Sequence, residues 1–467
     1  MLAGCAVGPN YKQPAVNTPA AFRGAANDDS TNSLADLPWW GLFKDPVLQD
    51  LIHVALTNNY DLQITLTRVD QARAIQAQAR SQFLPQVGYG GEANRGKNEY
   101  LGLPAPNGGR TMDSYLAGLG AVWELDLWGR VRRMNEAAKA NFMATQEGRR
   151  AVMISLVSGV AAAYFELLEL DEQLAIAQRT RDSYERTLKL FSDQHAGGLA
   201  SKLEVSRAEL ALRSVSANIP EIERQIALKE NEINTLLGRN PGPIARTSTL
   251  LAQDLPVEIP VGLPSSLLQR RPDIRAAEQG VRVANAEIGV AIGDFLPRIG
   301  LTTFYGGTST DLDNLLKSEA NVWSAAATAA GPIFTGGRLT GRYRQTKAAW
   351  EEAKLSYQKT ALTAFREVSD ALISRRRFEE GRSEQAQAVG AGRQAVELAT
   401  TRYKEGKASH YEVLEAQQQL YPAENTLSRL EAARRLAVVQ LYRALGGGWE
   451  NMEPSAHPLA EAAPSGK

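Results

Sequence analysis

The chain has 467 residues, and its 52 basic and 52 acidic side chains give a formal net charge of zero. Nucleic-acid-binding proteins usually carry a basic excess, so the balance argues against that class. Hydrophobic residues make up 43% of the chain and aromatic residues only 7%. This composition favours long helices packed side by side over a thick apolar core.

The single cysteine lies near the start of the chain, in Leu-Ala-Gly-Cys at residues 2–5. A disulfide within the chain is therefore impossible. The four residues match the lipobox, in which the cysteine is diacylglycerated and becomes the mature N-terminus, so we expect a lipid on Cys5. A chance match is the alternative. Ala6 is typical of lipoproteins sent to the outer membrane. A full signal peptide does not precede Cys5, so the chain is expected to begin partway through its precursor.

No run of 18 uninterrupted apolar residues is present, so a membrane-spanning helix is not expected. The most apolar stretch, Ala151 to Phe165, is short and is interrupted by serine and glycine. We interpret it as a buried helix segment.

Two halves of the chain repeat one pattern. FLPQVGY at 83–89 and FLPRIGL at 295–301 stand 212 positions apart, and after the strands the spacing becomes 208, as between GLAS at 198–201 and GKAS at 406–409. A constant spacing on either side of one four-residue difference indicates internal duplication. The predicted parts are a lipidated extended segment (1–44), a first repeat (45–240), an equatorial linker (241–263), a second repeat (264–446) and a C-terminal tail (447–467).

Each half is predicted to contain, in order, a helix, two strands, a very long helix, a tight turn and a returning helix. After the second FLP motif, Ile299, Leu301, Thr303 and Tyr305 alternate with small and polar residues. Strands of about ten residues suit a tilted membrane-spanning β-strand, and a soluble β-hairpin is the ordinary alternative.

The long helices have the spacing of coiled coils. No proline occurs from Arg130 to His195, so a helix of roughly 100 Å is possible at ~1.5 Å per residue. Apolar residues at heptad spacing on this helix and on the returning helix indicate a narrow packing seam. Glycines at 197, 198 and 406 predict the turns, and Pro422 predicts a kink in the last helix.

Four strands cannot close a barrel. In lipid, an open sheet edge would leave backbone N–H and C=O groups without partners. If these strands span a membrane, several chains must contribute to one barrel, and this argument leaves the number of chains open.

The chain resembles a known family, the outer-membrane factors or TolC-like outer-membrane efflux proteins, in their lipoprotein branch. The resemblance runs from Cys5 to Trp449, and its most specific segments are WELDLWGR, LLQRRPDIRAAE and GPIFTGGR, at 123–130, 267–278 and 331–338. It implies a mixed α and β membrane protein. Three chains would form one twelve-stranded β-barrel, continuous with an α-helical coiled-coil barrel in the periplasm.

The resemblance also implies a role and partners. The family's members are passive exit ducts in the outer membrane, and they connect through a periplasmic adaptor to an inner-membrane transporter of the resistance–nodulation–division class. Drugs, dyes, detergents and metal ions are the substrates to expect. The transporter supplies the energy, so no enzyme activity, cofactor, metal or nucleic acid is expected for this chain.

Gate residues are carried over from the family's pattern. Glu412 and Glu415 match positions that form acidic rings at the periplasmic constriction, and Tyr411 would narrow it further. Without the resemblance, the two glutamates would be interpreted as solvated surface charges. Glu204 and Tyr403 match a pair that latches the hairpins together.

The turns match the sites that meet the adaptor. At the position that can carry a basic locking residue, this chain has Ala408, with Lys407 beside it, so a second latch is not expected. The predicted docking residues are small or lie at the turns: Gly197, Gly198, Ala200, Ser201, Gly406, Lys407, Ala408 and Ser409.

Two other functions are alternatives to an exit duct. The chain's four histidines show no metal-binding spacing and no phosphate-binding loop is present, which argues against an enzyme. A periplasmic coiled-coil scaffold or adaptor lipoprotein without a pore is the second alternative. The doubled strand pairs argue against it, because a scaffold has no need of them.

Overall fold

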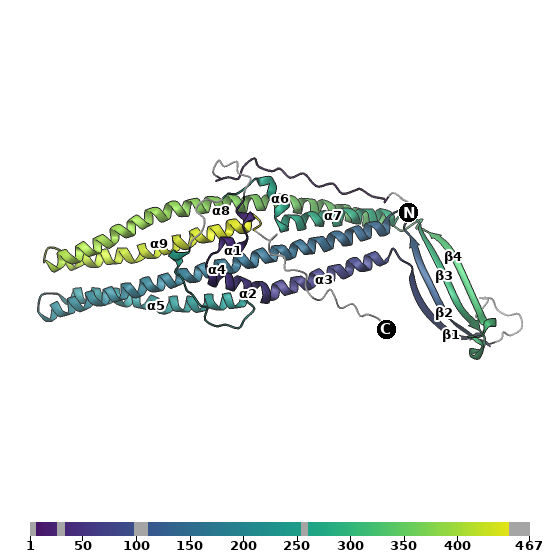
Figure 1. Ribbon diagram of the computed structural model, residues 1–467, viewed down its shortest axis with the longest axis horizontal. Coiled ribbons are helices and arrows are strands. Elements are labelled where there is room, and N and C mark those ends of the chain that lie inside the picture. The colour runs from purple at the N-terminus through teal and green to yellow at the C-terminus, as the bar shows by residue number, and fades with distance from the viewer. Residues whose placement is uncertain (1–5, 26–32, 98–110, 254–259, 448–467) are drawn as a thin grey trace. The chain divides into compact units, whose positions relative to one another are not determined.

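The computed structural model describes residues 6–25, 33–97, 111–253 and 260–447 (Figure 1). Cys5, the predicted lipidation site, lies outside them. The chain divides into two compact units, each drawn from both predicted repeats. Unit 1 contains residues 1–15, 67–146 and 276–359, and unit 2 contains residues 16–66, 147–275 and 360–467.

The principal elements follow the predicted order in both halves. They are α2 (Pro46–Asn58), α3 (Tyr60–Ser81), β1 (Gln86–Lys97), β2 (Thr111–Leu125), α4 (Arg130–Ala196), α5 (Lys202–Leu236), α7 (Pro272–Gly293), β3 (Arg298–Ser309), β4 (Asn321–Ala330), α8 (Arg338–Lys404) and α9 (His410–Ala444). The short helices are η1 (Leu34–Asp36), α1 (Trp39–Leu42), η2 (Leu250–Ala252), η3 (Pro264–Ser266), α6 (Leu267–Arg270), η4 (Leu312–Asn314) and η5 (Ser318–Ala320).

Corresponding helices of the two halves have equal lengths. Helices α4 and α8 each contain 67 residues, α5 and α9 each contain 35, and α3 and α7 each contain 22. Both returning helices continue through a proline, Pro220 in α5 and Pro422 in α9. The predicted long helices are therefore confirmed, whereas the kink at Pro422 stays a prediction.

The four strands form one antiparallel sheet in the order β1-β2-β3-β4. Gln86 pairs with Val122, Leu125 with Ile299, and Arg298 with Ala330. Because side chains alternate along a strand, this register collects large apolar residues on one face, as the alternation predicted. That face carries Val87, Tyr89, Tyr115, Leu119, Trp123, Leu125, Ile299, Leu301, Tyr305 and Trp323. The opposite face carries glycines and small or polar residues together with Met112, Leu116, Val122, Phe304 and Val322.

Strands β2 and β3 approach closely at a pair of glycines. Gly118 and Gly306 are register partners. A Cβ atom placed on Gly118 would lie 2.5 Å from the carbonyl oxygen of Tyr305 and 2.8 Å from the Cα of Gly306. Any larger residue at position 118 would push the two strands apart.

An extended N-terminal segment ties together three helices of unit 1. Arg133 of α4 donates to Asn10, with 2.9 Å between Nη2 and Oδ1, and Asn285 of α7 donates to the carbonyl of Pro9 at 2.9 Å. Gln13 donates to the hydroxyl of Tyr357 in α8 at 3.2 Å.

The apolar stretch of α4 is buried in unit 2. Helix α4 is the one described helix that is long and apolar enough to cross a membrane by length and composition, and 67% of its apolar window is buried. Val157, Val160, Tyr164 and Phe165 are at most 1% exposed. The prediction of a buried helix segment is confirmed.

Asp45 connects three parts of unit 2. Its carboxylate caps α2 through the N–H of Val47 at 2.8 Å. It also accepts hydrogen bonds from Tyr164 of α4 at 3.0 Å, from Ser248 at 2.5 Å and from Gln253 at 2.6 Å. The carboxylate therefore fixes α2 and the linker against α4.

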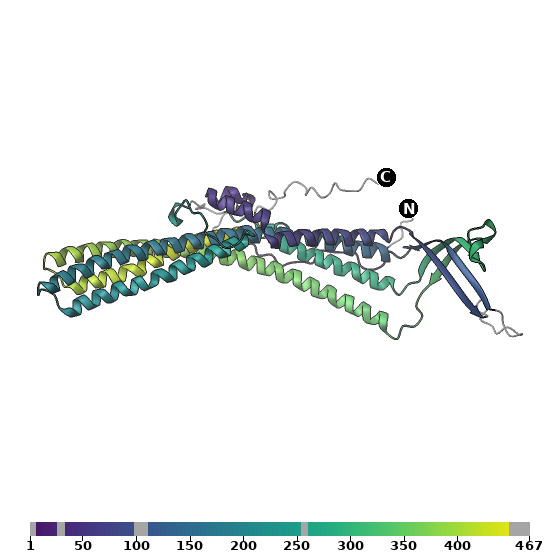
Figure 2. The ribbon, with the colours of Figure 1, turned by 90° about the horizontal axis from the view of Figure 1, so that it is seen from below.

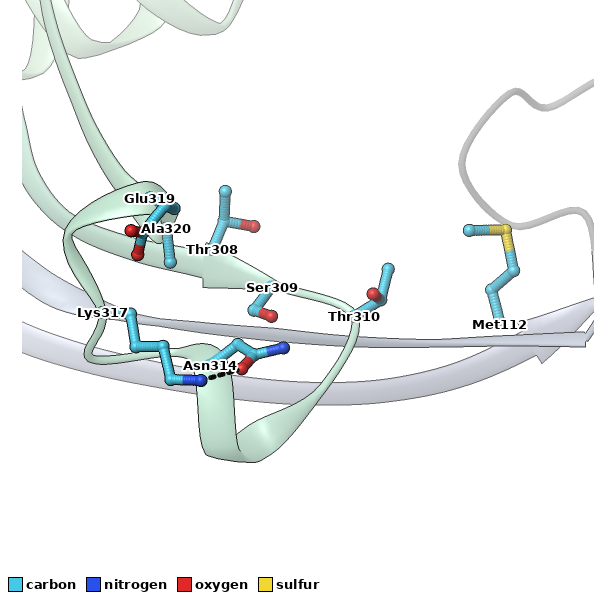
Figure 3. A pocket seen from close by; sticks show the side chains of 8 residues that line it. All are labelled: Met112, Thr308, Ser309, Thr310, Asn314, Lys317, Glu319 and Ala320. Atoms are coloured by element: carbon cyan, nitrogen blue, oxygen red, sulfur yellow. Dashed lines mark hydrogen bonds between the residues drawn. The ribbon is translucent and has the colours of Figure 1, made fainter.

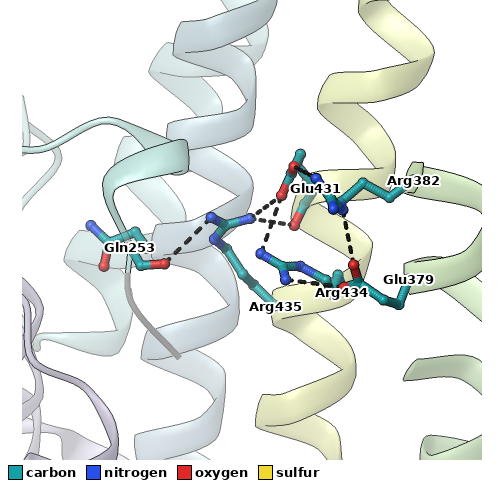
Figure 4. Close-up of polar contacts among 6 residues, drawn as sticks. All are labelled: Gln253, Glu379, Arg382, Glu431, Arg434 and Arg435. Atoms are coloured by element: carbon teal, nitrogen blue, oxygen red, sulfur yellow. Dashed lines mark hydrogen bonds and ion pairs between the residues drawn. The ribbon is translucent and has the colours of Figure 1, made fainter. Parts of the chain in front are cut away.

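A buried charge network joins α8 to α9 in unit 2 (Figure 4). Arg435 is 2% exposed and lies 2.6 Å from the carboxylate of Glu431, which also contacts Arg382 at 3.2 Å and Arg434 at 3.4 Å. Arg435 donates in addition to the carbonyl of Gln253 at 3.4 Å. Burial and the neighbouring arginines lower the pKa of Arg435.

Candidate functional site

The tips of the two helical hairpins have matching backbones. Gly198 and Gly406 adopt left-handed conformations, with φ of 76° and 73°, so glycine is needed at each turn. Each following helix begins with a capping box. The N–H of Ser201 donates to Glu204 at 2.5 Å, and the N–H of Ser409 donates to Glu412 at 3.2 Å.

The two tips differ in chemistry. Leu199 on the first tip is 84% exposed. Lys407, at the equivalent place on the second tip, forms an ion pair with Glu405 at 2.9 Å. The carbonyl of Ala200 contacts Nδ1 of His195 at 2.7 Å. One predicted docking turn is therefore apolar and the other is charged.

The two hairpins run side by side (Figure 2), and a histidine–carboxylate bond joins them near the tips. Nδ1 of His410 in α9 lies 2.7 Å from Oε1 of Glu204 in α5, and the two side chains are only 16% and 22% exposed. Nε2 of His410 is buried without a hydrogen-bond partner. The ring also meets Phe191 of α4 edge-on, with 5.8 Å between centroids.

Tyr403 forms a second bridge between the hairpins, but with a partner other than the predicted one. Its hydroxyl donates to Gln194 of α4, not to Glu204, whose Oε1 is bound to His410. The Tyr403 ring packs edge-on against Phe191, with 5.4 Å between centroids. Burial, together with the nearby carboxylate of Glu204, raises the pKa of Tyr403. Tyr403 and Glu204 are thus neighbours that use separate partners.

A third bridge lies farther from the turns. Gln417 of α9 is 7% exposed, and its amide nitrogen lies 3.2 Å from the hydroxyl oxygens of Ser183 and Thr187 in α4. Sequence reasoning did not identify His410, Gln194 or Gln417. Each of these residues binds a partner on another helix, far away along the chain, so no local sequence pattern identified them.

The predicted gate residues lie on the first turns of α9. Tyr411 is 54% exposed, and Glu412 is exposed apart from its capping bond. Glu415 is half-buried and accepts a hydrogen bond from Gln419 at 3.4 Å. Their convergence on a pore axis stays a prediction.

A pocket of about 740 Å³ lies at the loop end of the sheet (Figure 3). It is lined by Met112, Thr308, Ser309, Thr310, Asn314, Lys317, Glu319 and Ala320. Lys317 donates to Asn314 at 2.7 Å across its rim. The pocket is open to solvent, and most of its lining residues are polar.

Comparison with known proteins identifies the family. The family model "Outer membrane efflux protein" matches residues 51–239 and 263–447. The solvent efflux pump outer membrane protein SrpC of Pseudomonas putida is 34% identical over 456 residues, which are 96% of each chain. The cation efflux system protein CusC of an Escherichia coli O6:H1 strain is 32% identical over 452 residues, covering 96% of this chain and 97% of CusC.

Solved structures agree with that assignment. The outer-membrane channel OprN superposes with a TM-score of 0.89 at 29% identity, covering 96% of this chain and 100% of OprN. The open state of the Neisseria gonorrhoeae MtrE outer membrane channel superposes with a TM-score of 0.86 at 31% identity, covering 95% and 99%. The chain therefore belongs to the outer membrane efflux protein family: it is an outer-membrane exit duct of an efflux pump, it extends into the periplasm, and it is not an enzyme.

Proposed function

We propose that three copies of the chain assemble into one duct, with a twelve-stranded β-barrel in the outer membrane and a hollow cylinder of helices in the periplasm. Each copy contributes its four strands and its two helical hairpins. The two halves of each copy derive from an internal duplication. Substrate passes through without chemical change, driven by a separate transporter.

The open edges of the sheet carry this proposal. Strands β1 and β4 each pair on one side only within the described chain. In hydrocarbon, unpaired backbone groups cost several kcal/mol each, so a sheet in lipid must close on itself. Four strands are too few to enclose a channel. Pooling strands from identical copies removes every edge.

The composition of the sheet faces supports the same assembly. The face with the large apolar residues suits lipid, and the face rich in glycine and polar residues suits a water-filled lumen. Trp323 is 74% exposed near the loop end of β4. In a barrel, this ring belongs to the aromatic girdle at the membrane surface.

The hairpin tips are the proposed docking site for the partner proteins. A periplasmic adaptor meets the turns around Gly198 and Gly406, where small residues let another backbone approach. Leu199 offers it an apolar contact and Lys407 a charged one. Through the adaptor, the duct connects to an inner-membrane transporter of the resistance–nodulation–division class.

The gate is proposed to close at the same tips. The bonds His410–Glu204 and Tyr403–Gln194 hold the hairpins together, and Tyr411, Glu412 and Glu415 line the constriction. A hydrogen bond to a charged group contributes about 1.5–3 kcal/mol and a neutral one about 0.5–1.5 kcal/mol. In this proposal, contacts with the adaptor at the adjacent turns offset the free energy of these bonds and open the duct.

The substrates are proposed to be small molecules chosen upstream, with drugs, dyes, detergents and metal ions all admissible. Relatives at 34% and 32% identity are named for solvent and for cation efflux. Similar identity to both supports a duct of low selectivity. A lipid on Cys5 would anchor the chain but would not span the membrane.

The proposed assembly can be tested by extracting the protein from outer membranes and by measuring its ion conductance. A trimeric barrel should resist extraction from outer membranes by urea and high salt, have the mass of three chains in detergent, and conduct ions in a planar lipid bilayer. A scaffold without a pore would be released by urea and would leave the bilayer silent.

A further inference from the structure

The internal repeat preserves strand pairing residue by residue. Gln86 pairs with Val122 in the first hairpin. Adding 212 to position 86 gives Arg298, and adding 208 to position 122 gives Ala330. These two residues are register partners in the second hairpin. Adding 212 to each β1 position and 208 to its β2 partner therefore gives residues that pair in the same register between β3 and β4.

One ladder has no counterpart within the chain. Strand β2 of the first repeat pairs with β3 of the second, with Leu125 opposite Ile299. Its counterpart would pair β4 of the second repeat with a β1. Adding 208 to position 125 gives Ile333, and subtracting 212 from position 299 gives Val87.

We propose that β4 of one copy pairs antiparallel with β1 of the next copy in this register, with Ile333 opposite Val87 and Ala327 opposite Ala93. The inference rests on the proposed trimer and adds the residues that join its copies. In this arrangement the junction between copies reproduces the β2–β3 junction inside each copy. The barrel then has nearly six-fold regularity from three chains.

Side-chain alternation restricts the possible registers. Val87 and Tyr89 lie on the apolar face of β1, and Trp323 lies on the apolar face of β4. A shift of one residue would turn one strand's apolar side chains toward the lumen. The proposed register keeps the apolar faces of β1 and β4 continuous. Registers shifted by two residues would do the same, so they are the alternatives that an experiment must distinguish.

Apolar side chains at both edges lie on the face that the proposal turns toward lipid. Tyr89 is 93% exposed and Val87 is 72% exposed on β1, and Ile333, just beyond β4, is fully exposed. The register places Tyr89 opposite Gly331, where the ring can cover a residue without a side chain. On the lumen face it places Thr328 opposite Glu92, which pairs polar with polar.

Proline ends the ladder at one side. Pro332 has no N–H to donate, so backbone bonding stops beside it. Ile333 then contacts the next copy through its side chain alone. The junction therefore finishes with an apolar contact between Ile333 and Val87 at the helix end of the strands.

Cross-strand disulfides can measure this register. Opposed residues in an antiparallel ladder have Cα atoms about 4.5–5.5 Å apart, while diagonal neighbours are about 7–8 Å apart. A disulfide is not formed beyond about 7 Å without backbone movement. We would prepare Ala93→Cys/Ala327→Cys, with Ala93→Cys/Ala325→Cys and Ala93→Cys/Ala329→Cys as matched variants shifted by two residues. All four alanines lie on the apolar face and are exposed in the chain.

The variants would be oxidised in isolated outer membranes and separated on non-reducing gels, with the unmodified chain, whose one cysteine is Cys5, as background. We expect Ala93→Cys/Ala327→Cys to give a covalent trimer, at least about tenfold more abundant than from either shifted variant. If a shifted variant gave the most covalent trimer, the proposed register would be wrong. It would also be wrong if no variant formed disulfides although light scattering showed three chains. In both cases the proposed trimer would stand. A monomer in detergent would overturn the proposed function itself.

Discussion

Nδ1 of His410 lies 2.7 Å from Oε1 of Glu204, so the first residue of α9 is bound to the first turn of α5. Glu204 uses its other oxygen to cap α5. The carboxylate therefore fixes the beginning of one helix and holds the second hairpin to it. A bond in this place opposes any separation of the two tips.

Replacing His410 with phenylalanine should favour the open duct. The variant His410→Phe keeps an aromatic ring against Phe191 and removes the bond to Glu204. The lost bond should shift the ratio of closed to open states by about ten- to a hundredfold, seen as more frequent or larger openings in planar-bilayer recordings. The exposed His53→Phe is the control. Unchanged gating in His410→Phe would remove this bond from the gate.

Replacing Tyr403 with phenylalanine tests the second bridge. Tyr403→Phe retains the ring packing against Phe191 but loses the hydroxyl that donates to Gln194. We expect a smaller rise in conductance than for His410→Phe, because a neutral hydrogen bond contributes less than a bond to a carboxylate. Tyr60→Phe, at an exposed tyrosine of α3, should behave as wild type. Equal conductance in the two tyrosine variants would contradict the expectation.

The acidic lining of the constriction can be tested by ion selectivity. If three copies of Glu415 face one axis, their carboxylates attract cations and repel anions. Glu415→Gln should therefore lower the cation-to-anion permeability ratio, measured as the reversal potential in a salt gradient. The exposed Glu209→Gln in α5 serves as control. A reversal potential that stays constant would place Glu415 outside the pore.

Asp45 should make the stability of unit 2 depend on pH. Burial alone would raise its pKa, but hydrogen bonds from Ser248, Gln253, Val47 and Tyr164 bring it below the ordinary 3.8. A lowered pKa means that the ionised group stabilises the fold above about pH 4, and that this contribution is lost as pH falls through the folded-state value.

The variant Asp45→Ala should therefore lower the free energy of unfolding by about 2–4 kcal/mol at pH 7. The difference from wild type should shrink below about pH 4. Thermal unfolding followed by the helical circular dichroism signal would measure both effects, and Asp50→Ala, an exposed position of α2, is the control. A difference that stays the same down to pH 3 would contradict the argument.

The glycine pair between β2 and β3 predicts a local requirement for small residues. Gly118→Val should separate these strands and lower the temperature at which the oligomer dissociates on heated gels. Gly120 lies on the same face of β2, and a Cβ there would be 3.5 Å from its nearest neighbour, an ordinary contact. Gly120→Ala should therefore have little effect. Equal losses in the two variants would show that close approach at Gly118 is not the cause.

Much of the fold could be predicted because its signals are periodic or repeated. The FLP motifs, with proline ending a helix and alternation beginning after it, located β1 and β3. The absence of proline from Arg130 to His195 predicted the long helix. Each motif can be recognised from a short stretch of neighbouring residues, because it reflects local backbone preference or local side-chain alternation.

The partners of individual polar side chains could not be predicted in the same way. Tyr403 and Gln194 are 209 residues apart, and Glu204 and His410 are 206 apart. Which of them meet depends on the rotation of four helices about their axes, and a small rotation exchanges neighbouring acceptors. The resemblance pairs Tyr403 with Glu204, whereas in the structure Tyr403 donates to Gln194 and Glu204 is bonded to His410.

The matched lengths of α5 and α9, and of α4 and α8, limit how the chain can change size. An added residue lengthens a helix by ~1.5 Å and rotates everything beyond it by about a quarter turn. An insertion in only one hairpin would leave the two tips at different depths and take His410 out of reach of Glu204. Viable length variants should therefore arise as compensated pairs, in whole heptads, with both arms of both hairpins altered together.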